Sequence, residues 1–383
     1  MTVRVALISG PMYDALYTRL DYFAQQYGVA IEVSFSGDHP TLNEFLTTDA
    51  AADCHVVSTH TKYAPSQQLL LAPLHDLLAP AELDDFTPAV LELARINGKI
   101  YSVPRNVDVR LLHYRTDLID RPPTTWDELL DIARSVNHPP ELYGFLFPGM
   151  ESGLFGTFYE LVEMGGAELF SSDLKPKIEN EGGRWALQFL RTCYAEGLVP
   201  PEIVNWHYNH VHDAFRTGHA AMVGDWPGYY ADYCAADSPV RDRFALALYP
   251  TGPTGVMRVY GGSHTFALTQ RGADNDDALA LLRFLTAPEQ QLLEARQGSV
   301  PVRRSVMQQV QQEATPIQKQ RWRAIADAIE CVVIPPKFER YPLVEKVLWK
   351  MVQSAMTGAL DIDEALHTIT VQITEIVAGN HAR

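Results

Sequence analysis

A carboxylate and several aromatic rings lie close together in the segment 225–230. Asp225 is followed directly by Trp226, and Tyr229 comes three residues later. A flat aromatic face packs against the apolar side of a saturated ring, and a carboxylate accepts hydrogen bonds from paired hydroxyls. The segment therefore predicts contact with a small polyhydroxylated ligand. The same residues also fit the start of a buried helix with Asp225 as its N-cap, and the two interpretations are compatible.

Polar residues also follow a run of extended sequence near position 105. The Asn-Gly pair at 97–98 is a hairpin turn signal, from which a strand should leave. Pro104 removes one backbone donor from that strand, so its pairing should loosen there. Arg105, Asn106 and Asp108 come directly after this point and are candidates to face a ligand. The alternative is that Arg105 and Asp108 form an ordinary surface ion pair.

Paired glycines mark a third candidate contact at residues 261–264. Gly262 allows close approach of the backbone to a ligand, and Ser263 and His264 add polar groups beside it. A flexible hinge explains the glycines almost as well. The segment lacks the lysine and the strand-loop-helix frame of a phosphate-binding Walker motif.

Three histidines in the segment 206–213 raise the question of a metal site. On a helix, His207 and His210 share a face, whereas His212 projects elsewhere. The usual catalytic zinc motif has two histidines four residues apart with a glutamate between them, and that pattern is missing. We therefore expect no metal and no cofactor, and we place Trp206 or His207 at the border of a ligand cleft.

Recognisable catalytic patterns are missing from the sequence. We find no nucleophile elbow, no set of kinase motifs and no paired carboxylates in a defined frame. A glycoside hydrolase would need two carboxylates at a mechanistically fixed separation across a cleft. The prediction is therefore a binding protein and not an enzyme.

The N-terminal region alternates between strand and helix patterns, which positions several further side chains. After a first strand, the spacing of apolar residues predicts a helix over 13–27 ended by Gly28, a strand over 29–35, a helix over 41–48 and a strand over 54–58. This βαβα order builds a mostly parallel sheet with ligands beyond the carboxyl ends of its strands. The loops at those ends supply five more candidate contacts, Tyr13, Asp14, His60, Lys62 and Tyr63.

Length and composition narrow the classes of function. The chain has 383 residues, which predicts two or three domains, and a hydrophobic fraction of 46%, which predicts a well-packed protein. Its net charge of −16 argues against a nucleic-acid partner. No apolar run is long enough to cross a bilayer.

Several segments, in this order, resemble one known family. The segments are Asn-Gly-Lys-Ile-Tyr-Ser-Val-Pro at 97–104, Pro-Pro-Thr-Thr-Trp-Asp-Glu-Leu-Leu at 122–130, Ala-Phe-Arg-Thr-Gly-His-Ala-Ala-Met at 214–222, Pro-Thr-Gly-Pro-Thr-Gly at 250–255, and Phe-Leu-Thr-Ala-Pro-Glu-Gln at 284–290. Together with their surroundings, these segments resemble the family 1 extracytoplasmic solute-binding proteins. That family comprises the maltose-binding-protein-like sugar receptors of ABC importers. The similarity extends over roughly residues 3 to 310 and becomes weak beyond them.

The resemblance implies an α/β fold of the two-lobe periplasmic-binding-protein kind, type II-like. Mixed sheets flanked by helices would form each lobe, with a ligand cleft at the hinge. The implied boundaries are 1–108 plus 261–310 for lobe one, 111–258 plus 313–383 for lobe two, and hinge segments near 107–111, 259–261 and 302–310.

The resemblance also implies a function. The chain would bind a small sugar, oligosaccharide or polyol, close around it by hinge bending, and deliver it to the permease of an ABC importer. Glu151 is a further candidate ligand contact. We expect a monomer that neither spans a membrane nor binds nucleic acid. Two alternatives stay open, a cytoplasmic solute sensor of the same fold and a carbohydrate-active enzyme.

The sequence leaves location, cysteine pairing and ligand charge open. No signal peptide precedes the first strand, so an extracytoplasmic location is expected from the resemblance alone and a cytoplasmic one is the alternative. The four cysteines are expected to be small buried residues, although Cys193 and Cys234 could pair in an oxidising compartment. Arg105 and Lys62 would suit an acidic or phosphorylated sugar unless neighbouring carboxylates neutralise them.

Overall fold

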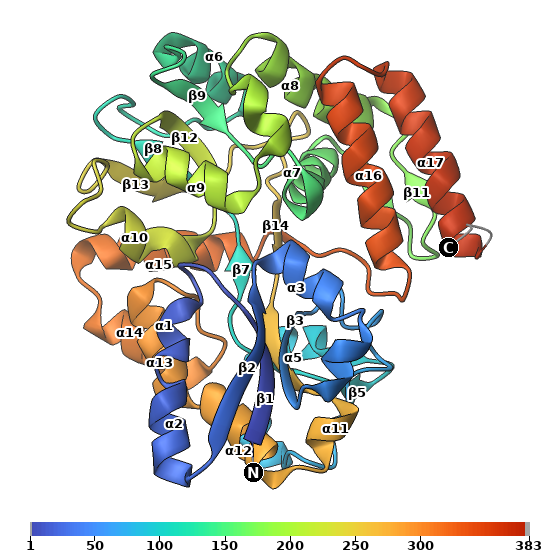
Figure 1. Cartoon of the computed structure of the whole chain (residues 1–383). Coiled ribbons are helices and arrows are strands. Elements are labelled where there is room, and N and C mark those ends of the chain that lie inside the picture. The colour runs from blue at the N-terminus through green and yellow to red at the C-terminus, as the bar shows by residue number, and fades with distance from the viewer. Residues whose placement is uncertain (1, 380–383) are drawn as a thin grey trace.

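The strands of the protein gather mainly into two sheets that lie at opposite ends of the molecule. The computed structural model describes residues 2–379 (Figure 1). In Figure 1 the N-terminal sheet occupies the lower body and the second sheet occupies the upper body, with helices packed around both. A third, small sheet lies where the two bodies meet.

The five-stranded sheet of the lower body has the order β2-β1-β3-β15-β6. β1 (Thr2–Ile8) pairs in parallel with β2 (Ala30–Gly37) and β3 (Val56–His60). β15 (His264–Leu268) runs antiparallel to both β3 and β6 (Val103–Pro104). The predicted parallel order therefore holds for the first three strands. The two later strands make the sheet mixed.

Short helices and one hairpin complete the lower body. A long helix predicted over 13–27 is two helices here, and the second ends at Gly28, whose φ of 65° is left-handed. The Asn-Gly turn at 97–98 has positive φ at both residues and joins the predicted hairpin. The elements are α1 (Asp14–Tyr17), α2 (Leu20–Tyr27), α3 (His39–Phe45), η1 (Asp49–Asp53), α4 (Pro80–Leu83), α5 (Pro88–Leu93), β4 (Arg95–Ile96), β5 (Lys99–Ile100), α11 (Gln270–Ala273), α12 (Asp276–Leu285), α13 (Pro288–Gln297) and α14 (Arg304–Glu313).

The four-stranded sheet of the upper body has the order β13-β8-β12-β9. β8 (Leu111–Arg115) runs antiparallel to β13 (Phe244–Ala247) and β12 (Ala220–Asp225), while β9 (Tyr143–Leu146) is parallel to β12. The surrounding elements are α6 (Trp126–Val136), α7 (Glu151–Met164), β10 (Glu168–Phe170), β11 (Pro176–Lys177), α8 (Glu181–Ala195), η2 (Pro201–Asn205), α9 (Tyr208–Arg216), η3 (Pro227–Tyr229), α10 (Tyr230–Tyr233), α15 (Pro316–Ile329), α16 (Tyr341–Met356) and α17 (Ile362–Ala378).

The small sheet between the bodies brings two predicted crossover segments side by side. β14 (Val259–Gly262) runs antiparallel to β7 (Asp108–Val109) and parallel to β16 (Val332–Val333). A Cβ on Gly261 would lie 2.3 Å from Cγ2 of Val332, so a glycine is needed for this close packing. The exact division of the chain into lobes stays a prediction.

The structure tests two further expectations, one on the burial and pairing of the cysteines and one on membrane-spanning helices. All four cysteines are free thiols, and only Cys54 and Cys193 are buried, whereas Cys234 and Cys331 are half-buried. The alternative of a Cys193–Cys234 disulfide therefore does not hold in this structure, and the expectation that all four are buried was wrong for two. Among residues 2–379, every helix is too short or too polar to span a bilayer.

Candidate ligand-binding cleft

A hollow between the two bodies, called the cleft below, collects side chains from both main sheets. Its enclosed cavity has a volume of about 50 Å³. Strand ends of the lower body form one side, and α9, the β12 exit and β14 form the other. Its lining residues are Ile8, Ser9, Met12, Tyr13, Asp38, His39, His60, Lys62, Asp108, His207, Tyr208, Asn209, Trp226, Tyr229, Tyr260, Gly262 and His264.

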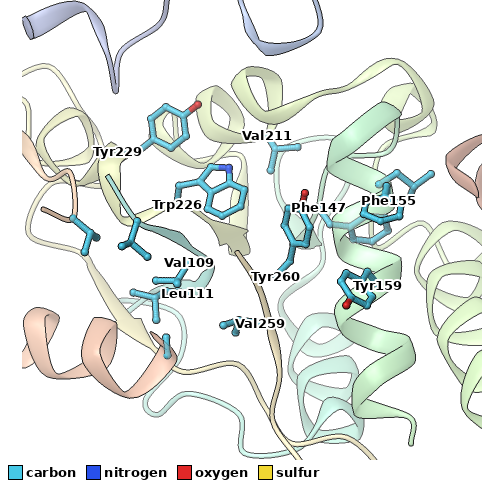
Figure 2. Close-up of a cluster of buried hydrophobic side chains, with 14 of the residues drawn as sticks. Val109, Leu111, Phe147, Phe155, Tyr159, Val211, Trp226, Tyr229, Val259 and Tyr260 are labelled. Carbon is cyan, nitrogen blue, oxygen red and sulfur yellow. The ribbon is translucent and has the colours of Figure 1, made fainter. Parts of the chain in front are cut away.

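Aromatic rings form the wall of the cleft on the upper body. Trp226 follows the last residue of β12 in an extended conformation, and Pro227 begins the 3-10 helix after it. Figure 2 shows Trp226 with Tyr229 on one side and Tyr260 on the other. The Trp226 ring lies 5.5 Å from the Tyr208 ring and 6.2 Å from the Tyr260 ring, centroid to centroid. These faces offer the apolar stacking surface that a saturated sugar ring requires.

A buried arginine supports the aromatic wall from behind. The guanidinium carbon of Arg110 lies 5.2 Å from the centre of the Trp226 ring and 5.5 Å from that of Tyr260. Arg110 is only 1% exposed and donates to the carboxylate of Glu160 at 3.1 Å. Its contacts with the two rings hold them in place. Because its charge is paired with Glu160 inside the core, Arg110 presents no net charge to the ligand.

Imidazole rings form much of the opposite wall. His60 and His264 face each other across β3 and β15, with ring centroids 4.9 Å apart. The ring of His39, at the start of α3, lies 5.5 Å from His60 and 5.3 Å from His264. Burial lowers the pKa of His264 to about 3 and holds the pKa of His39 and of His60 well below the usual range. The rings are therefore neutral at pH 7, and each has one donor and one acceptor.

A single buried carboxylate lies beside these rings. Asp108 is 6% exposed, and one of its oxygens lies 3.6 Å from Nε2 of His264. Burial raises the pKa of Asp108 to about 7, against the opposing effect of Arg105. Asn106 orients the group, because its amide donates to Asp108 at 2.6 Å and accepts from the backbone of His264 at 3.1 Å. Asn106 thus supports the cleft without lining it.

The two cations singled out in the sequence are each paired with a carboxylate. Nζ of Lys62 donates to Glu345 and to the Tyr260 hydroxyl, both at 2.8 Å. Arg105 donates through Nε to Glu294 at 2.7 Å and does not line the cleft. Both side chains are buried, so the pairing removes their charge from the surroundings. Of the two alternatives for these cations, neutralisation is the one observed.

Half of the sixteen predicted contacts line the cleft. They are Tyr13, His60, Lys62, Asp108, Trp226, Tyr229, Gly262 and His264. Their contact with a ligand stays a prediction.

The other predicted contacts are engaged elsewhere, each for a visible reason. Asp14 accepts from the backbone of Gly10 at 2.9 Å, and Ser263 donates to the carbonyl of His264 at 3.0 Å. Asp225 is 2% exposed and accepts from the hydroxyl of Tyr233. The remaining cases besides Arg105 and Asn106 are Tyr63, which donates to Glu345; Glu151, which borders a neighbouring hollow; and Trp206, whose ring stacks 6.3 Å from that of His210.

Nine of the lining residues were not among the predicted contacts. Five of them could have been chosen from the sequence: Ser9 and Met12 follow β1, Asp38 and His39 follow β2 at the same sheet edge, and Tyr260 lies in a predicted crossover. His207 had been placed at the cleft border without being chosen. The others are Ile8, Tyr208 and Asn209, for which the sequence contains no such indication.

The histidines of the segment 206–213 do not converge on one point. His207 lies 3.2 Å from the Ser152 hydroxyl, and Nδ1 of His210 accepts from the His207 backbone at 3.3 Å. His212 pairs with Asp232 at 2.6 Å. These three histidines therefore form no common metal site.

The fold and cleft define a class of protein that binds a small solute between two α/β bodies. A family model described as "Bacterial extracellular solute-binding protein" matches residues 18–320. The chain belongs to this family, as its motifs indicated.

Individual comparisons agree with that assignment. The chain is 25% identical to maltose-bound MalE3 of T. maritima, with a TM-score of 0.88 over 97% of this chain and 99% of that one. It is 25% identical to the mannitol-binding protein of Pseudomonas aeruginosa over 85% of this chain and 81% of that one. A probable ABC transporter-binding protein of Deinococcus radiodurans is 26% identical over 60% of this chain, and the match spans 57% of that relative's length. The predicted two-lobe fold is confirmed, and the family and its structural neighbours are binding proteins.

Proposed function

We propose that this chain binds a neutral sugar or polyol in the cleft and passes it to an ABC importer. One observation carries the proposal: the cleft sets a wall of aromatic faces opposite a wall of neutral imidazoles and one buried carboxylate. Aromatic faces suit the C–H side of a sugar ring, and imidazoles both donate to and accept from hydroxyls. The names of the mannitol-binding and maltose-bound relatives are consistent with such a ligand.

The charge balance of the cleft supports a neutral ligand over an acidic one. Lys62, Arg105 and Arg110 are each held by a buried carboxylate. A ligand phosphate or carboxylate would have to compete with Glu345 for Lys62. It would also approach Asp108 and leave a buried charge incompletely paired.

The size of the cleft supports a binding cycle with opening and closing. The cavity in the cleft, about 50 Å³, is well below the roughly 300–1,000 Å³ of ordinary ligand sites. We infer that the bodies separate at β7, β14 and the segment near 302–310 to admit a ligand. Contacts from both bodies then favour the closed form, since a ligand shifts only the equilibrium between states it binds unequally. The lobe boundaries expected from the sequence are part of this proposal.

The family supplies the cellular setting. Its members are extracellular solute-binding proteins, so we propose that this chain acts outside the cytoplasm, as a monomer, with a membrane permease as its partner. Its lack of catalytic activity is likewise part of the proposal.

Calorimetric titration against matched neutral and charged ligands tests the proposed function. The panel is mannitol, ribitol and maltose, compared with gluconate and mannitol 1-phosphate. The expected result is saturable binding of at least one of the three neutral compounds and no binding of gluconate or mannitol 1-phosphate. Preferential binding of the phosphate or the acid would overturn the proposed ligand class, and conversion of a bound oligosaccharide during incubation would overturn the assignment as a binder.

A further inference from the structure

Three potential metal ligands converge on the lower-body wall of the cleft. His60, Asp108 and His264 each offer a ligand atom, and these atoms lie within 4.8 Å of one another. Each residue is 6% exposed. Two imidazoles and one carboxylate are a common donor set for first-row divalent metals, and they leave coordination positions open.

The backbone holds these three groups together. His60 and His264 are direct partners in the antiparallel pair of β3 and β15, and Asp108 is the partner of Gly262 in the pair of β7 and β14. A Cβ on Gly262 would lie 2.5 Å from Cε1 of His60. The glycine therefore leaves the space that the His60 ring occupies. Ligands on paired strands are more precisely placed than ligands on loops.

The His264 ring lacks hydrogen-bond partners among residues 2–379. Its Nδ1 is buried without any partner, and its Nε2 is 3.6 Å from Asp108, beyond hydrogen-bonding distance. A buried polar atom without a partner costs roughly 1–3 kcal/mol, so it calls for an explanation. The unpartnered Nδ1 of His264 is available to a ligand, whereas Nδ1 of His60 already accepts from the backbone of Lys62.

We propose that His60, Asp108 and His264 bind a divalent transition-metal ion, Zn²⁺ being the best match to this donor set. Asn106 supports the site from outside, because its amide fixes the Asp108 carboxylate at 2.6 Å. The ring of His39 lies 5.5 Å from that of His60 and 5.3 Å from that of His264, centroid to centroid, and is the candidate for a further donor. The proposal departs from the sequence-based expectation of no metal, and it does not rest on sugar binding.

Two neighbouring interactions bear on metal affinity. The His60 Nδ1 accepts from the backbone N–H of Lys62 at 3.2 Å, so coordination through Nε2 moves the ring proton to Nδ1 and gives up this bond. The ammonium of Lys62 would repel a cation, but Glu345 neutralises it at 2.8 Å. Two carboxyl side chains, those of Asp38 and Asp108, line the cleft.

Titration of chelator-treated protein with ZnCl2, followed by calorimetry, tests the proposal. We expect one Zn²⁺ per chain at pH 7.5. His60→Ala, His264→Ala and the isosteric Asp108→Asn should each weaken binding at least tenfold, because second-shell changes alone cost roughly 10–100-fold. His39→Ala should weaken it less. Titration with CoCl2 adds a second readout, since visible absorption bands report Co²⁺ held by nitrogen and oxygen ligands in a distorted site.

Two control variants separate this site from other histidines. His210→Ala and His219→Ala remove imidazoles outside the three-residue cluster and should leave zinc affinity unchanged. Near-ultraviolet circular dichroism verifies that each variant is folded. Absence of a stoichiometric zinc site, or equal affinity in the wild type and Asp108→Asn, would refute the proposal. Repeating the mannitol, ribitol and maltose titrations in EDTA shows whether sugar binding stands without the metal, so the two proposals fail separately.

Discussion

Trp226 is the residue on which the aromatic wall of the cleft is centred. It lies between Tyr208 and Tyr260, is backed by Arg110, and is 8% exposed. A ring in this position would offer both apolar area and a stacking face to a sugar bound in the cleft. The turn after β12, in which Pro227 begins the 3-10 helix, holds the backbone of Trp226 at this wall.

Replacement of Trp226 by alanine should weaken sugar or polyol binding by roughly 10–100-fold, equivalent to about 1.4–2.7 kcal/mol. The measurement is calorimetry with the neutral compound that binds the wild type. Trp206→Ala is the matched control, because Trp206 stacks on His210 and does not line the cleft. Equal losses in both variants would point to a general effect on the fold and would contradict a stacking role for Trp226.

A second prediction concerns the contribution of His113 to the stability of the fold at different pH values. It is fully buried on β8, and burial lowers its pKa to about 4. The unfolded chain takes up the proton near pH 6.5, so the contribution of this neutral ring is complete above that pH and is lost as the pH falls toward 4. The loss amounts to about 3 kcal/mol, since one pKa unit corresponds to about 1.4 kcal/mol.

Urea unfolding at pH 7.5 and pH 4.5 measures this effect. His113→Phe places a ring among Phe215, Tyr233 and Phe244 and should lose less stability between the two pH values than the wild type, by about 2–3 kcal/mol. The same pH dependence in both proteins would show that His113 does not titrate as its burial requires.

The site could be predicted from the sequence where one short segment places its own side chains. Trp226 and Tyr229 lie on such a segment, and His264 comes shortly after the glycines of β14. Prediction failed where a distant partner decides the outcome. Arg105 is occupied by Glu294, 189 residues away, and Tyr63 by Glu345, 282 residues away. Periodicity and turn signals contain no information about such long-range pairing.

At the scale of elements, α16 connects the C-terminal part of the chain to the loop after β3. Glu345 on α16 accepts from Lys62 at 2.8 Å, from the hydroxyl of Tyr341 at 2.6 Å, and from that of Tyr63. The Lys62 side chain is 2% exposed and the Glu345 side chain 8% exposed. The similarity detected in the sequence faded before this helix, so its role was not predicted.

Glu345→Gln should lower the free energy of unfolding by about 3–5 kcal/mol, because it leaves the Lys62 ammonium buried without its counter-ion. Chemical denaturation with matched m-values measures the change. Glu313→Gln breaks an exposed ion pair with Arg296 and should have little effect. A small effect of both changes would mean that Lys62 reaches water or another partner when Glu345 is neutral.

The secondary structure was easier to predict than the sheets. The hairpin at 97–98 and the first three parallel strands follow from local turn and periodicity signals. The position of β15 beside β3 does not follow from such signals, because His264 and its partner His60 are far apart along the chain. A strand added from so distant a segment leaves no local trace, so the mixed sheets were predicted by the family resemblance and not by the local sequence pattern.

At the scale of the whole molecule, two bodies meet at a small sheet and enclose a cleft lined from both sides. β7 and β14 cross between the bodies next to each other, so a small rotation there changes the separation of the cleft walls. The aromatic wall belongs to the upper body and the imidazole wall to the lower one. A ligand that contacts both walls therefore favours the closed arrangement.

Small-angle X-ray scattering with and without a saturating neutral ligand tests this central claim most directly. The ligand is whichever of mannitol, ribitol or maltose binds in calorimetry, and the Trp226→Ala variant at the same ligand concentration is the control. We predict that the radius of gyration of the wild type decreases on ligand binding and that the variant changes less at a concentration that does not saturate it. An identical scattering profile for free and fully saturated wild-type protein would contradict closure of two bodies around the ligand.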